Sequence, residues 1–194
     1  MVELGIGTRV TGLCEHLQVI GINASVMKET NWWGISGQPH IWWEHVMGVI
    51  KLEGRDIDVI NVVNVRSRYL NMWYLDFIVR TSSPHVSMRE DYAKLIMKRS
   101  FGGNLLIFIN IYSAKIVGME WRGDTDLVRE LNFDNQLKNK LLNTDLRSLR
   151  GLLEIVPEPK YRCTRIRTSY FLPSLELFDI LETIARHIGP LPCQ

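Results

Sequence analysis

The first regular pattern of apolar residues along this chain has the spacing of a helix. In residues 8–19 they follow one another three or four positions apart, which predicts a short helix that ends near Gly21. The apolar positions of this helix are Val10, Leu13, Cys14 and Leu17. Extended stretches rich in Val and Ile follow at 22–27, 41–52, 56–66 and 72–80. The last three have connections too short for crossover helices, so we expect an antiparallel meander.

The second half of the chain mixes helical and extended patterns. Residues 89–99 predict a charged amphipathic helix, whereas 105–112 is apolar on both faces, as in a central strand. A helix is expected to begin at Asp124 as its N-cap and to bend near Asn132. Two further strands, at 151–156 and 161–168, precede a C-terminal helix between Pro173 and Gly189. The apolar stripe of that helix is Leu175, Phe178, Leu181, Ile184, Ala185 and Ile188.

The order of these elements predicts the fold class. Strands lead, and helices are interspersed without regular alternation of strand and helix, which favours an α+β fold over a parallel α/β fold. We expect a largely antiparallel sheet with an N-terminal helix, a mid-chain helix and a C-terminal amphipathic helix packed on it. The length of 194 residues suits one such domain, spanning 1–194.

The layout resembles a family of uncharacterised prokaryotic α+β domains of unknown function. One matching feature is a short helix followed by a hairpin that contains a glycine and then a Gly-Arg pair, here Gly48 and Gly54-Arg55. Another is a Gly-Asp pair at the start of a helix, here Gly123-Asp124. An apolar strand and a C-terminal amphipathic helix complete the pattern. The resemblance implies the fold and carries no activity.

Composition narrows the class of protein. The chain is 46% hydrophobic and 23% charged with a net charge of +2, which is typical of a packed globular protein and requires neither nucleic acid nor a membrane surface. Its three cysteines, Cys14, Cys163 and Cys193, show no paired spacing, so reduced thiols and a cytoplasmic location are expected. No secretory signal is visible, and the longest apolar run, 105–109, is far below the roughly 20 residues that span a bilayer.

No catalytic motif stands out. His40, Glu44 and His45 lack the spacing that brings zinc ligands together, and a buried strand position is the expected place for Cys163 despite its arginine neighbours. We therefore predict no catalytic residue, metal or cofactor, and a binding or assembly module rather than an enzyme.

Tryptophan is concentrated in one segment. Trp32, Trp33, Trp42 and Trp43 are four of the six tryptophans of the chain. Adjacent side chains on a strand point to opposite faces, so one core cannot cover both rings of a doublet. Three candidates could cover the outer rings: a loop of the same chain, a partner such as the second copy of a homodimer, or a ligand. We predict an aromatic patch or pocket wall used for self-association or for a ligand.

An arginine-rich region supplies the alternative function. Arg147, Arg150, Arg162, Arg165 and Arg167 lie near Tyr161 and Tyr170, a combination that suits an anion or a nucleic acid. Alternation along the strand places Arg165 and Arg167 on one face and Arg162 on the other. The competing interpretation is a solvated face paired with the helix acids Glu176, Asp179 and Glu182.

Overall fold

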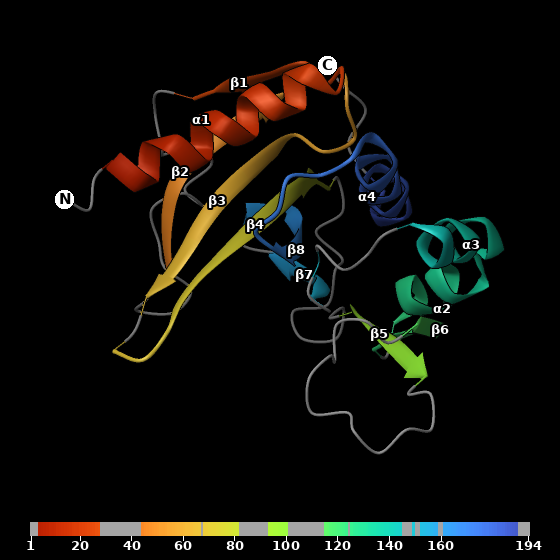
Figure 1. The fold of residues 1–194 in the computed structure, drawn as a ribbon. Helices are drawn as coiled ribbons and strands as arrows, with labels where there is room; N and C mark the ends of the chain where they lie inside the picture. The colour runs from red at the N-terminus through yellow and green to blue at the C-terminus, as the bar shows by residue number, and fades with distance from the viewer. Residues whose placement is uncertain are drawn as a thin grey trace.

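The computed structural model describes residues 4–27, 44–66, 68–81, 93–100, 115–123, 125–144, 149, 152–158 and 161–189. Its described strands form one antiparallel sheet of eight strands, accompanied by four helices (Figure 1). The elements in chain order are α1 (Leu4–Val19), β1 (Ala24–Val26), β2 (Glu44–Leu52), β3 (Val59–Arg66), β4 (Asn71–Arg80), β5 (Ala93–Ser100), β6 (Lys115–Arg122), α2 (Asp126–Phe133), α3 (Asn135–Asn143), β7 (Leu153–Glu158), β8 (Cys163–Ser169) and α4 (Leu175–Ile188). The predicted α+β class is confirmed.

The strand order is β1-β2-β3-β4-β8-β7-β5-β6. The meander predicted for the first half is present, because β2, β3 and β4 pair as successive antiparallel neighbours. The late strand β8 then pairs with β4, and β7 joins it to the antiparallel pair of β5 and β6. Residues distant in sequence thus meet at the centre of the sheet.

The segment 93–100 is a strand, so the helix predicted for 89–99 is wrong there. Ala93 and Leu95 are fully buried in the core, whereas Lys94 between them lies on the opposite face and pairs with Glu154 at 2.7 Å. This is the two-residue period of a strand. Because the predicted helical face consisted of a few apolar positions only, the pattern also fitted a strand. The strand predicted at 105–112 lies outside the described residues.

The mid-chain helix is two helices. Thr125 rather than Asp124 is the N-cap of α2, since its Oγ1 accepts a hydrogen bond from the Val128 amide at 3.2 Å. The bend expected near Asn132 occurs at Asp134, whose carboxylate accepts from the Leu137 amide at 2.8 Å and caps α3. The pKa of Asp134 is lowered by the hydrogen bond from the Leu137 amide and by His187, whose Nε2 lies 2.9 Å from Asp134 Oδ2.

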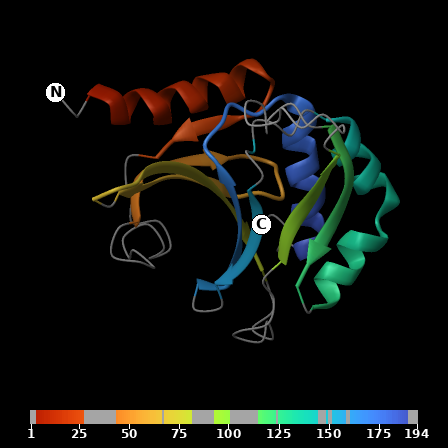
Figure 2. The ribbon, with the colours of Figure 1, turned by 60° about the horizontal axis from the view of Figure 1, so that its bottom comes forward.

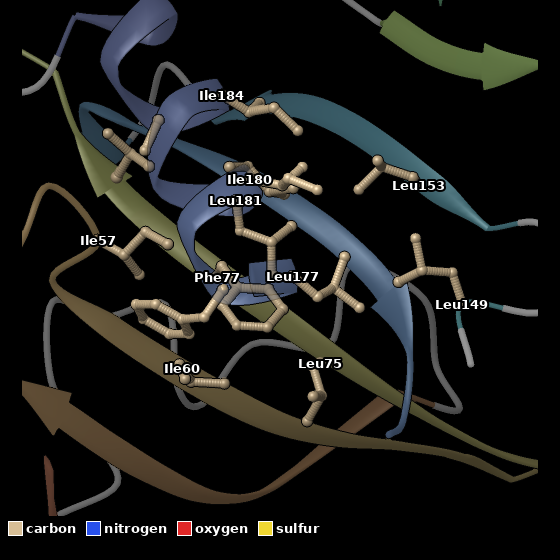
Figure 3. Close-up of a cluster of buried hydrophobic side chains, with 14 of the residues drawn as sticks. Ile57, Ile60, Leu75, Phe77, Leu149, Leu153, Leu177, Ile180, Leu181 and Ile184 are labelled. Carbon is tan, nitrogen blue, oxygen red and sulfur yellow. The ribbon is translucent and has the colours of Figure 1, made fainter. Parts of the chain in front are cut away.

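The main core lies between one face of the sheet and the helices. Side chains from β3, β4 and α4 interdigitate there (Figure 3). The rings of Phe77 and Phe178 meet edge to face, with their centroids 6.5 Å apart. Helix α4 begins after its N-cap Ser174 and ends at Gly189, which has a φ of 77° that favours glycine. On the same face of the sheet, α1 packs on β1 and β2.

Candidate functional site

The face of the sheet opposite the main core carries a different kind of chemistry. We call it the inner face. Across the register, one row on this face is polar through five strands and comprises Asn61, Asp76, Arg167, Glu154 and Lys94. None of the described helices contributes to it, because their buried apolar residues belong to the main core. This row of the inner face is therefore polar, in contrast to the main core.

The inner face is concave between β2 and β8. These strands are separated by β3 and β4, so their Cα atoms would lie about 14 Å apart on a flat sheet. Side chains stand roughly perpendicular to a sheet. Nevertheless Arg167 Nη1 donates to Glu44 Oε1 at 2.6 Å, which requires the strands to curve toward this face. Figure 2 shows this curvature in β3 and β4.

Arg167 is held by two carboxylates. Its Nε and Nη2 donate to the two Asp76 oxygens at 2.7 and 2.8 Å, and Nη1 and Nη2 donate to the two Glu44 oxygens at 2.6 and 3.2 Å. Burial lowers the pKa of Arg167, but hydrogen bonds and charge interactions with both carboxylates outweigh it and raise that pKa. The centre of the Tyr74 ring lies 5.3 Å from this guanidinium. Burial is the largest cause that raises the pKa of Tyr74.

Arg165 is held more loosely on the same face. Its Nη1 lies 3.3 Å from Asp76 Oδ2 and 3.8 Å from Glu44 Oε2, and its Nη2 lies 3.2 Å from Glu158 Oε1. The residue is only 9% exposed, yet its Nε–H has no hydrogen-bond partner among the described residues. We call Glu44, Asp76, Glu158, Arg165 and Arg167 the charged cluster.

An apolar patch adjoins the charged cluster. It consists of Val49, Val59, Ile78 and Cys163, with Met27, Val46 and Tyr161 packed against it. Burial is the largest cause that raises the pKa of Cys163 to about 12, so this thiol remains protonated at neutral pH. Cys14 is also buried, as its place on the apolar side of the first helix predicted. Neither residue has the environment of a thiolate nucleophile.

The structure brings together only part of the predicted arginine set. Arg165 and Arg167 share a face as expected, but they pair with strand acids and not with the helix acids Glu176, Asp179 and Glu182. Arg162 is exposed, just before β8, with a φ of 50°. Arg147 and Arg150 lie outside the described residues, so their role stays a prediction.

The tryptophan doublets, Trp32, Trp33, Trp42 and Trp43, also lie outside the described residues. The described chain stops at Met27 before them and resumes at Glu44 after them. Met27 packs against the apolar patch of the inner face, and Glu44 belongs to the charged cluster. The two described residues that flank the segment 28–43 therefore both lie on the inner face.

The sequence interpretation missed the three acids of the charged cluster. Asp76 carried a usable signal, because it is the single acid of the strand 72–80, in which Arg80 at the end is the only other charged residue. Buried acids of this kind need a partner. Glu44 and Glu158 carried no comparable signal, since both stand near strand ends where charged residues are common. Among the described residues, no three His, Cys, Asp or Glu side chains are placed to hold a metal ion.

The fold and the site define an α+β protein with an antiparallel sheet and a buried charged cluster on the face opposite the main core. No protein-family model, curated protein or solved structure matches the chain. Of the helices that the structure describes, none has both the length and the apolar character needed to cross a membrane.

Proposed function

We propose that the protein is a binding module that takes a small molecule at the inner face, with the tryptophan doublets as the aromatic part of the site. The observation that carries this proposal is the charged cluster. Burying ion pairs costs desolvation that their attraction barely repays, and apolar residues of similar volume often give equal or greater stability. A cluster of five charged residues on one face is therefore better explained by recognition than by stability.

The place of the doublets in the sequence supports the same site. The segment that contains them leaves and rejoins the described chain at residues of the inner face, Met27 and Glu44. Tryptophan buries about 150–250 Å² when it is covered and is enriched where proteins bind their partners. An aromatic surface next to a few fixed polar groups is the usual composition of a small-molecule site.

The alternative, binding of an anion or a nucleic acid through the arginines, has less support. Arg165 is buried and Arg167 is partly buried, and both face carboxylates, so their charge is already compensated. A phosphate would have to displace these carboxylates before it could pair with either guanidinium. Of the other arginines in this set, Arg162 is exposed and could take part.

Native mass spectrometry of freshly purified protein at low and moderate salt tests the proposal. We expect a monomer with a small-molecule adduct that survives moderate salt. The adduct should be lost in Trp42→Ala and Trp43→Ala with the circular dichroism spectrum unchanged. Trp73→Phe is the matched control, because Trp73 packs against Arg9 and Tyr170, away from the charged cluster.

Other outcomes would contradict the small-molecule site. A clean dimer without an adduct would assign the aromatic surface to self-association. An oligonucleotide adduct that disappears steeply with salt would favour the arginine alternative. A bare monomer at both salt concentrations would leave coverage by the chain itself as the explanation of the doublets.

A further inference from the structure

We infer that the ligand of the inner face presents an uncharged oxygen acceptor, such as an amide carbonyl, a ketone or a hydroxyl group, to the Nε–H of Arg165. This inference rests on the proposed function and adds the chemical class of the ligand. It also identifies the residue that selects that class.

The two arginines of the charged cluster differ in how many donors they use. Arg167 engages Nε, Nη1 and Nη2 with two carboxylates, at distances down to 2.6 Å. Arg165 contacts its carboxylates at 3.2 to 3.8 Å and leaves Nε–H without a described partner. A buried donor without an acceptor is costly, and more so on a charged group. An acceptor supplied by a ligand would remove that cost.

The surrounding charges decide which acceptor is favoured. Three carboxylates, those of Glu44, Asp76 and Glu158, lie within 3.8 Å of the Arg165 guanidinium. A ligand carboxylate or phosphate would approach these three anions in a buried site, where like charges repel strongly. An ammonium group offers hydrogens and no lone pair, so it cannot accept from Nε–H. A neutral oxygen meets both requirements.

Three probes that share one ring and differ in one polar group provide the test. Benzamide is neutral, benzoate is an anion and benzylamine is a cation, and their binding is measured by calorimetry. We expect benzamide to bind at least roughly tenfold more tightly than the other two, the effect of one hydrogen bond to a charged donor. In nitrogen-resolved NMR spectra, benzamide should shift the side-chain Nε–Hε signal of Arg165 more than that of Arg167.

Arg165→Lys isolates the donor, because lysine retains the positive charge and lacks Nε–H. The variant should bind benzamide roughly tenfold more weakly and lose its preference over benzoate. Arg129→Lys, on the exposed surface of α2, is the control and should bind as the wild type does. If Arg165→Lys does not fold, the Arg165 Nε–Hε shift in the wild type decides the question.

The outcomes separate this inference from the proposed function. Tighter binding of benzoate or benzylamine would overturn the inference and leave a small-molecule site in place. Benzamide binding that shifts Arg167 and not Arg165 would overturn the assignment of the donor. Absence of binding by all three probes would overturn the inference, and together with a bare monomer in native mass spectrometry it would overturn the proposed function as well.

Discussion

At the centre of β4 the two faces of the strand are both buried and chemically opposite. On β4, Phe77 is fully buried in the main core, and its neighbour Asp76 is 2% exposed on the inner face. The phenyl ring gains stability simply by leaving water. The carboxylate loses hydration and regains it only through well-placed guanidinium donors. Equal burial therefore implies different sensitivity: the main core depends on volume, and the inner face depends on geometry and charge.

The same contrast appears within the inner face. Arg167 uses both of its carboxylate partners in a forked geometry, which fixes its position. Arg165 has longer contacts and an unmatched donor. Arg167 therefore holds the charged cluster together, whereas Arg165 keeps one donor without a partner among the described residues.

The largest loss of stability is expected from Phe77→Ala in the main core. The change removes a fully buried ring that contacts Phe178. Large-to-small substitution of a buried phenylalanine costs about 3–5 kcal/mol, from lost transfer free energy and from the cavity left behind. Urea denaturation gives the free energy of unfolding. Phe77→Leu should lose clearly less, and equal losses in the two variants would contradict the importance of volume on this face.

Asp76→Asn is expected to cost about 3 kcal/mol by a different mechanism, because the amide has one acceptor oxygen where the carboxylate has two and places an NH2 donor against the Arg167 guanidinium. The substitution keeps the size of the side chain but removes the negative charge that Arg167 and Arg165 both contact. Losing one partner in this way is more costly than losing the pair as a whole. Urea denaturation beside the wild type measures the loss.

Replacing the pairs together separates charge from volume. In a variant with Glu44→Gln, Asp76→Asn, Glu158→Gln, Arg165→Met and Arg167→Met, no charge of the cluster remains. The free energy of unfolding of this variant should recover most of the loss seen in Asp76→Asn. A loss equal to or greater than that of Asp76→Asn would mean that the charged cluster stabilises the fold, and would weaken the argument that it serves binding.

Local periodicity in the sequence was sufficient to predict most elements. The long stripe of α4 and the Val-rich strands of the meander are strong signals, because many residues agree on one period. The segment 93–100 was misassigned because few apolar positions fitted both a helix and a strand. The pairing of β8 with β4 carries no local signal at all, since the two strands lie far apart in sequence.

The candidate site was predictable only in part for the same reason. Alternation along one strand placed Arg165 and Arg167 on a shared face, and the structure confirms it. Their partners Glu44 and Asp76 come from strands whose position depends on the order of the sheet and on its curvature. Neither property can be deduced from residues within a few positions of the arginines.

The smallest effect concerns the contact of α1 with the sheet on the main-core side. A Cβ atom at Gly48 would lie 2.7 Å from Val10 Cγ2 and 2.8 Å from Cγ1. Valine on a helix has little rotameric freedom, so it cannot move aside. Gly48→Ala should therefore cost about 2 kcal/mol, within the range for overpacking. Gly12→Ala on α1 is the matched control: nothing lies within 4 Å of its Cβ, and it should stabilise the helix by roughly 0.5–1 kcal/mol.

A double-mutant cycle tests the cause of the Gly48 effect. Val10→Ala removes both Cγ atoms and leaves Val10 Cβ, 3.3 Å from the methyl carbon that Gly48→Ala introduces, as the nearest atom. In that background Gly48→Ala should cost less than about 1 kcal/mol, a coupling of about 1 kcal/mol between the two sites. Additive losses would show that Gly48 is needed for backbone conformation at the bulge between Val46 and Gly48, and not for close packing. The main-core face would then depend on backbone geometry as well as on volume, which would narrow its difference from the inner face.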